Sequence, residues 1–221
     1  MKIIAKIHND FKEKFGIPRQ SGRVTGLISR IVFEPEYRVR EALRGIEGFT
    51  HLWLIWHFSE AERDSWSPTV RPPRLGGNCR MGVFATRSPY RPNPIGLSSV
   101  KLVGIEDDRT LGTVLLVSGA DLLDGTPIYD IKPYLAYTDS HPEAVGGFAD
   151  PVCDYSLKVD FPDALLSRVP EEKREPLIKL LSDDPRPSYQ DDPERVYGMK
   201  FSDFEVCFRV SDGVLTVTEI K

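Results

Sequence analysis

Residues 81–118 read MGVFATRSPYRPNPIGLSSVKLVGIEDDRTLGTVLLVS, and this stretch contains three of the β-strands that we predict. Apolar and β-branched side chains gather at Met81–Thr86, Ser98–Ile105 and Thr113–Ser118, with turn residues between them. Short runs of this composition, bounded by proline, glycine or aspartate, are typical of strands. We therefore expect a β-rich fold around this stretch.

Strand-like runs continue on both sides. We predict strands at Arg23–Phe33, His51–Phe58 and Pro127–Lys132, and a short helix from Pro35 to Arg44 that ends at Gly45. Many short strands with few long helices indicate a barrel or a sandwich.

The character of the chain changes around residues 140–147, where Pro142, Gly146 and Gly147 lie in a polar stretch that suits a linker. Beyond it we predict a strand at Tyr155–Phe161, a helical region at Asp163–Ser182 interrupted near Pro170 and Pro176, and a hairpin of Phe204–Val210 and Val214–Ile220 around the Asp212-Gly213 turn. We expect two domains, at residues 1–140 and 141–221, of which the second is a small α+β unit.

Composition excludes several classes of protein. The chain has 221 residues, a net charge of −4 and 40% hydrophobic residues, values typical of a globular protein that needs neither disulfide nor metal to form a core. The longest apolar run, Leu52–Trp56, is too short for a membrane helix. A second lysine at position 6 comes before any apolar signal core could form, so we expect no secretion signal. Three widely spaced cysteines cannot all pair, which favours a reducing cytoplasm.

Charge is distributed unevenly along the sequence. From Ser65 to Ile105 there is no acidic residue but there are six basic ones: Arg71, Arg74, Arg80, Arg87, Arg91 and Lys101. One interpretation is that the arginines are simply spread over a solvated face, but the absence of acids over so long a stretch favours an anionic partner. Phosphate, carboxylate and nucleic acid all fit, and charge alone does not choose among them.

Familiar nucleotide and metal motifs are absent from the sequence. There is no G-x-G-x-x-G and no G-x-x-x-x-G-K, which argues against a Rossmann or P-loop nucleotide site. The four histidines lack zinc spacing and no C-x-x-C occurs, so we expect no metal. A Ser-His-Asp triad is not excluded by composition, but there is no G-x-S-x-G elbow.

The segment Ala85–Ser98, ATRSPYRPNPIGLS, is the most informative for function. Its three prolines fix φ and restrain the residues before them, so that Arg87 and Arg91 are held in place. Held arginines suit bidentate contact with a carboxylate or phosphate. The plain alternative, a rigid connector between two strands, stays open.

Four segments together carry a family resemblance: Phe15–Gln20, Gly82–Ser98, Leu122–Tyr134 and Asp184–Tyr189, in this order. They resemble the TsaA-like or TrmO family over essentially the whole chain. The resemblance implies a β-barrel methyltransferase without a Rossmann fold, with S-adenosylmethionine as cofactor. It also implies a homodimer that methylates N6 of threonylcarbamoyladenosine beside the anticodon of threonine tRNA.

Site residues follow from the same resemblance, position by position. It implies that the methyl donor is bound by Pro18, Arg19, Gln20, Ser59, Glu60, Arg87, Leu97, Asp124, Gly125, Thr126 and Pro127. Our candidates for contact with tRNA are Arg71, Arg74, Arg91, Arg186 and Tyr189, the last two in the C-terminal domain, where an arginine beside an aromatic ring suits unpaired bases. Tyr90 stands where many members have His or Phe, and we give it no catalytic role.

The chemistry of the implied reaction calls for a base. The lone pair of a urea-like N6 is delocalised, so that removal of its proton would help transfer. Asp124, Tyr129 and His57 are candidates that the sequence does not rank. Two other functions stay open: a non-catalytic RNA-binding barrel, and methylation of a small metabolite with the same donor.

Overall fold

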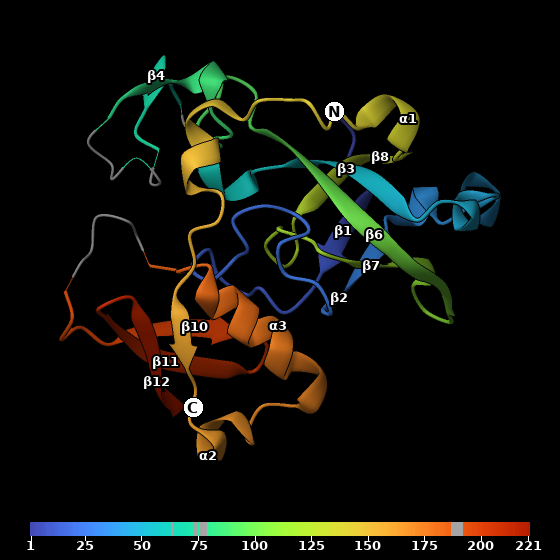
Figure 1. The fold of residues 1–221 in the computed structure, drawn as a ribbon. Helices are drawn as coiled ribbons and strands as arrows, with labels where there is room; N and C mark the ends of the chain where they lie inside the picture. The colour runs from blue at the N-terminus through green and yellow to red at the C-terminus, as the bar shows by residue number, and fades with distance from the viewer. Residues whose placement is uncertain (63, 73–74, 76–78, 187–191) are drawn as a thin grey trace.

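A computed structural model describes residues 1–62, 64–72, 75, 79–186 and 192–221 (Figure 1). Six strands form a closed barrel in the order β1-β2-β7-β6-β3-β8. Their bounds are β1 Ala5–His8, β2 Ile28–Phe33, β3 His51–His57, β6 Ile95–Asp108, β7 Gly112–Ser118 and β8 Pro127–Pro133. The mainly β fold and the barrel predicted for the N-terminal part are thus confirmed.

Alternating side chains fill the barrel. Inward-facing positions along β3 and in the first half of β6 are buried and their neighbours are not, which is the period-two pattern of a strand. The interior is apolar and includes Ile7, Ile31, Leu52, Leu54, Leu115 and Ile128. Four-residue β1 closes the barrel, since it pairs with β2 on one side and with β8 on the other.

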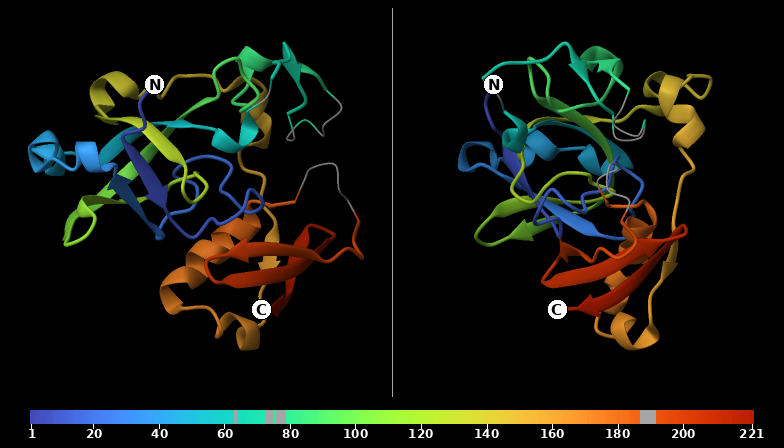
Figure 2. Two further views of the ribbon diagram at one scale, coloured as in Figure 1. Left: turned by 180° about the vertical axis from the view of Figure 1, so that it is seen from behind. Right: turned by 90° about the vertical axis from the view of Figure 1, so that its left-hand side faces the viewer.

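The C-terminal part has its own sheet, in the order β10-β11-β12-β9. Its strands are β9 Lys158–Asp160, β10 Tyr197–Phe201, β11 Phe204–Ser211 and β12 Val214–Ile220, and its helices are α2 Asp163–Leu166 and α3 Glu171–Ser182. The chain therefore begins in the barrel and ends in this second sheet, at opposite ends of the molecule (Figure 2). The predicted small α+β unit is confirmed, and Asp212 and Gly213 both have positive φ in the predicted hairpin turn.

The connection between β1 and β2, residues 9–27, packs on the C-terminal sheet. Phe11, Val24 and Leu27 belong to the same buried cluster as Leu177 of α3 and Phe208 of β11. The second hydrophobic core is thus completed by residues from the N-terminal part of the sequence. The division of the chain at residue 140 into two domains stays a prediction, and this connection ties the two parts together.

Short elements surround the barrel. They are the two-stranded sheet of β4 (Thr69–Val70) and β5 (Met81–Gly82), the helix α1 (Ala136–Asp139), and 3₁₀ turns at Pro35–Tyr37, Arg40–Leu43, Ile46–Gly48, Ser59–Ala61, Val83–Ala85 and Gly147–Val152. Among the described residues no helix is long and apolar enough to cross a membrane.

Some local predictions were wrong. The predicted helix Pro35–Arg44 is a series of 3₁₀ turns, because Val39 is extended and interrupts the helical backbone. The predicted strand Met81–Thr86 ends at Gly82, where pairing with β4 stops. Pro170 does precede α3, but Pro176 lies inside that helix and does not end it.

Candidate functional site

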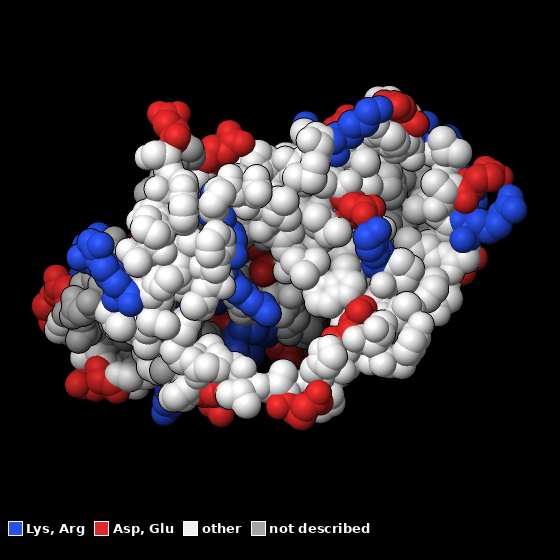
Figure 3. All heavy atoms as spheres, turned by 90° about the horizontal axis from the view of Figure 1, so that it is seen from above, with Lys and Arg blue, Asp and Glu red and all other residues white. Residues whose placement is uncertain are grey.

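A cleft of about 1690 Å³ opens beside the barrel, and its lining includes the proline-rich segment and residues 64–72. Figure 3 shows the molecule hollowed on one face, with Lys or Arg side chains in the hollow. The volume of the cleft exceeds the range of roughly 300–1,000 Å³ that is usual for small-molecule pockets. Its described lining has two acidic residues, Glu62 and Asp64, and five arginines: Arg19, Arg71, Arg80, Arg87 and Arg91. The cleft therefore suits an anionic ligand larger than a metabolite.

The proline-rich segment is held rigidly by its own side chains. Arg91 donates from Nη1 to the carbonyl oxygens of Val83 (3.1 Å) and Thr86 (2.7 Å), and the Thr86 hydroxyl also donates to Val83 O. These bonds close the 3₁₀ turn against the segment that follows it. The predicted restraint on this loop therefore has a structural basis in Arg91 as well as in the prolines.

Arg87 reaches across to the connection between β1 and β2. Its Nη1 donates to Oε1 of Gln20, 67 residues away in the sequence. Close by, Ser98 donates to the Asp121 carboxylate (2.5 Å) and accepts from the indole N–H of Trp56 (2.9 Å). Burial raises the pKa of Asp121, although the Ser98 bond, the Ser21 N–H and the Arg87 charge oppose this shift.

Asp121, Ser98 and Trp56 join the site to the barrel wall, and the sequence predictions did not include them among the site residues. One signal was available: Ser98 is a polar residue at an inward-facing, buried position of β6. Gly96 on the same face faces Trp56 across the β3–β6 pair, and a Cβ there would lie 2.2 Å from the indole. Glycine therefore makes room for the ring whose N–H reaches Ser98.

Asp124 belongs to a second group of residues that we predict to bind the methyl donor. Its carboxylate accepts from the backbone N–H of Asn9 (2.9 Å) and lies 3.0 Å from Lys12 Nζ. Burial alone would raise the pKa of Asp124, but the Asn9 bond and Lys12 lower it overall. Gly125 adopts φ +79° in the turn that follows, as the Asp-Gly signal predicts, and Thr126 is buried.

His57 and Tyr129 lie together. Their rings stack with centroids 5.5 Å apart, and His57 Nε2 lies 2.8 Å from Oε1 of Glu62, which lines the cleft. Two of the three candidate bases are therefore neighbours, and a cleft carboxylate orients one of them.

Comparison with known proteins bears on what this site is for. Residues 6–140 match the tRNA-methyltransferase O N-terminal domain, and residues 154–221 match the TrmO C-terminal domain. The chain belongs to the TrmO family. It is 41% identical over 226 residues to the tRNA (adenine(37)-N6)-methyltransferase of Escherichia coli, covering 99% of this chain and 96% of that protein.

Other relatives agree with this assignment. The Eikenella corrodens tRNA (adenine(37)-N6)-methyltransferase is 47% identical over 173 residues, which cover 78% of this chain and 97% of that protein. A crystal structure of TrmO from Pseudomonas aeruginosa superposes with a TM-score of 0.76 at 32% identity, over 99% of this chain and 97% of that chain. The likeness to TrmO proteins thus spans both sheets.

Three of the residues that the TrmO resemblance implies for donor binding, Arg87, Glu60 and Asp124, contact the segment of residues 12–20. Gln20 contacts Arg87, and Lys12 contacts Asp124. Lys14 donates from Nζ to the backbone oxygen of Glu60 (2.6 Å). The remaining members differ in exposure: Pro18 and Thr126 are buried, Pro127 begins β8, Ser59 is exposed and Leu97 is 59% exposed on the outer face of β6. Donor contact by these residues stays a prediction.

The candidates for RNA contact do not all lie in the cleft. Arg71 and Arg91 line the cleft. Arg186 instead makes a two-point ion pair with Asp184, at 2.9 and 3.0 Å, which neutralises its charge within the C-terminal part. Arg74 and Tyr189 lie outside the described residues. Among the residues that the structure covers, no group of three or more His, Cys, Asp or Glu side chains is arranged to hold a metal ion.

The raised pKa of Asp121 leads to a testable prediction for the pH dependence of stability in Asp121→Asn. A raised folded-state pKa means that the free energy of unfolding falls as pH rises from the ordinary value of 3.8 through the folded value. Asparagine keeps an acceptor for Ser98 without that cost. We expect the variant to gain stability over the natural protein as pH rises from 3 to 7, measured by thermal unfolding at several pH values.

Asp108 provides a control of opposite sign. Backbone N–H groups of Leu111 and Thr110 lower the pKa of Asp108, so its contribution is present above the ordinary pKa and is lost as pH falls. Asp108→Asn should therefore be less stable than the natural protein at pH 7 and approach it at pH 3. Parallel pH profiles for the two variants would contradict our account of Asp121.

Proposed function

We propose that this chain is an S-adenosylmethionine-dependent methyltransferase that acts on N6 of adenosine 37 in tRNA. The single observation that supports this most is the full-length likeness to the E. coli tRNA (adenine(37)-N6)-methyltransferase. A P. aeruginosa relative that covers 92% of this chain is described as a putative S-adenosylmethionine-dependent methyltransferase. The arginine-lined cleft fits an RNA substrate, because phosphate contacts supply much of the affinity for nucleic acid.

Arg87, Asp121 and Asp124 fit the chemistry of the methyl donor. The donor carries a carboxylate, an ammonium and a ribose diol, and it supplies an electrophilic methyl group on a sulfonium. Arg87 is a guanidinium that matches the carboxylate, while Asp121 and Asp124 provide acceptors for the ammonium and the diol. The protein's main task is then to align donor and acceptor, since methyl transfer is an in-line displacement.

Among the candidate bases, Asp124 is the least suited. Its lowered pKa means that its carboxylate holds a proton less readily than an ordinary aspartate. His57 and Tyr129 stack on one another, and Glu62 orients the imidazole from the cleft side. We propose that the proton of N6 is lost to this pair.

We further propose that the acceptor is threonylcarbamoyladenosine of threonine tRNA, and that the enzyme works as a homodimer in the cytoplasm. The structure describes free cysteines at 79, 153 and 207, a state compatible with a reducing compartment. The acceptor identity rests on the family resemblance.

Mass spectrometry of nucleosides tests the proposal. Threonine tRNA from cells with and without this gene is digested, and the modified adenosine is compared. We expect a nucleoside heavier by one CH₂ group in the presence of the gene, and purified protein with S-adenosylmethionine should restore it in vitro. Binding of tRNA without transfer would leave a non-catalytic RNA-binding barrel, and turnover unaffected by RNA would indicate a small-metabolite acceptor.

A further inference from the structure

Two large aromatic side chains are exposed inside the cleft and have no role in the site described so far. Phe84 is 70% exposed and Trp66 is 51% exposed, and both line the cleft. Their ring centroids lie 6.0 Å apart with planes tilted by 32°. Together they present a contiguous apolar surface, which on a folded protein commonly marks a binding site.

The position of Phe84 is fixed by the local backbone. In the 3₁₀ turn Val83–Ala85, Val83 is buried and Phe84 points outward. Arg91 bonds the carbonyl oxygens of Val83 and Thr86, and its guanidinium carbon lies 5.6 Å from the centroid of the Phe84 ring. A restrained ring loses little conformational entropy on binding, which favours a role in recognition.

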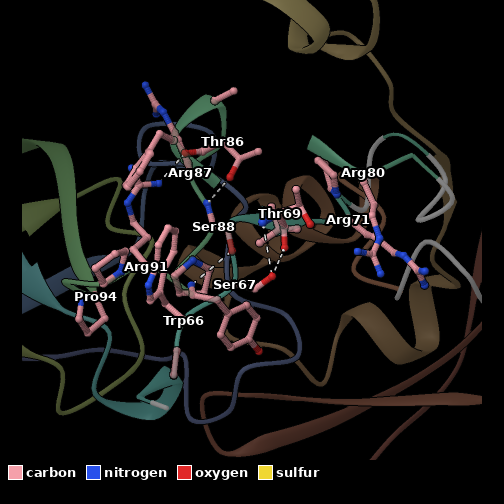
Figure 4. A pocket seen from close by; sticks show the side chains of 18 of the residues that line it. Trp66, Ser67, Thr69, Arg71, Arg80, Thr86, Arg87, Ser88, Arg91 and Pro94 are labelled. Atoms are coloured by element: carbon pink, nitrogen blue, oxygen red, sulfur yellow. Dashed lines mark hydrogen bonds between the residues drawn. The ribbon is translucent and has the colours of Figure 1, made fainter. Parts of the chain in front are cut away.

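Charge around the rings indicates what they bind. Figure 4 shows Trp66 and Arg91 on one side of the pocket and Arg71 and Arg80 on the other. The acidic residues of the described lining are Glu62, which pairs with His57, and Asp64. A ligand for this surface must therefore combine anionic groups with a flat apolar face.

We propose that Trp66 and Phe84 form a platform on which an unpaired nucleobase of the RNA substrate stacks, while the cleft arginines hold its phosphates. Unpaired bases stack on aromatic and guanidinium faces, and every base has such a face to offer. Arg91 behind Phe84 adds a cation–π contact that supports the ring. This inference rests on the proposed function, because it assumes an RNA substrate with unpaired bases next to the acceptor.

Substitution by leucine tests the platform. Trp66→Leu and Phe84→Leu keep an apolar side chain but remove the aromatic face, and we expect each to weaken binding of unmodified threonine tRNA by roughly 5- to 150-fold. Trp66→Phe and Phe84→Tyr should restore most of the affinity. Tyr137→Leu is the matched control, because Tyr137 is 86% exposed on α1 and does not line the cleft.

Further measurements separate the outcomes. Affinity for S-adenosylmethionine and the thermal midpoint should change little in the leucine variants, since both rings are exposed. If methylation of tRNA is established but the leucine variants bind tRNA normally, the platform is wrong and the proposed function stands. If no methyl group is transferred but the variants still lose RNA affinity, the platform stands without that function. Loss of self-association instead of RNA affinity, seen by sedimentation, would assign the rings to contact between copies of this chain and overturn the proposal.

Discussion

Binding of S-adenosylmethionine should become undetectable by calorimetry when Arg87 is replaced by alanine. Arg87 is held by Gln20 on one side and attracted by Asp121 on the other, so its guanidinium is set in place before any ligand arrives. Hydrogen bonds to charged groups contribute about 1.5–3 kcal/mol each, so losing the two that a guanidinium makes with a carboxylate weakens binding by at least roughly 150-fold. Calorimetric titration at equal protein concentrations measures this directly.

Arg80→Ala is the matched control for this prediction. Arg80 lines the same cleft as Arg87, and replacing it by alanine removes the same positive charge. Arg80→Ala should leave affinity for the donor nearly unchanged. Arg87→Lys should bind weakly, because a single ammonium does not reproduce two parallel guanidinium bonds. Normal donor affinity in Arg87→Ala would remove Arg87 from the donor site. Thermal unfolding of each variant establishes that the fold is intact.

Much of the fold follows from local sequence signals. His51–His57, Gly112–Ser118 and the C-terminal hairpin carry alternating or β-branched residues between turn signals, and each was predicted within a residue or two. In contrast, β1 (Ala5–His8) has only four residues, too few for their alternation of apolar and polar side chains to stand out in the sequence. Its strand conformation comes from pairing with β2 and with β8, which lies over 120 residues further along the chain.

In the candidate site, too, local features could be predicted from the sequence and contacts between distant segments could not. Restraint of the proline-rich segment was predictable, because proline fixes its own φ and limits the preceding residue. Two contacts, Arg87 with Gln20 and Ser98 with Asp121, join segments that are distant in sequence. No local sequence pattern predicts them. The role of the C-terminal part could not be predicted either, because it depends on which residues of the N-terminal part its helix α3 contacts.

Arg23 and Asp183 form the main polar contact between the connection of β1 with β2 and the end of α3. Arg23 donates from Nε (2.7 Å) and Nη2 (2.6 Å) to the two carboxylate oxygens of Asp183, at the end of α3. The Asp183 side chain is 4% exposed and the Arg23 side chain 26%. Four residues earlier, Arg19 donates to the backbone oxygen of Asp184 (2.5 Å). The C-terminal part thus holds the segment that contains Gln20, the partner of Arg87.

Replacing Arg23 by alanine should therefore lower stability sharply and weaken donor binding as well. Removing one partner of a buried ion pair leaves an uncompensated charge, at a cost of about 3–5 kcal/mol. Denaturant unfolding measures this loss. In Arg40→Ala, the control, the broken pair with Asp107 is well exposed on both sides and should cost no more than about 1 kcal/mol.

A double variant, Arg23→Met with Asp183→Leu, separates the charge from the contact. It removes both charged groups, so the penalty for a lone buried carboxylate disappears and much of the stability should return. Donor affinity should follow stability only in part, because apolar side chains pack against each other without fixing the direction of the Arg19–Gln20 turn. If the double variant regained full donor affinity, the Arg23–Asp183 ion pair would serve folding alone. If Arg23→Ala were as stable as Arg40→Ala, the C-terminal part would not hold this segment through Asp183 at all.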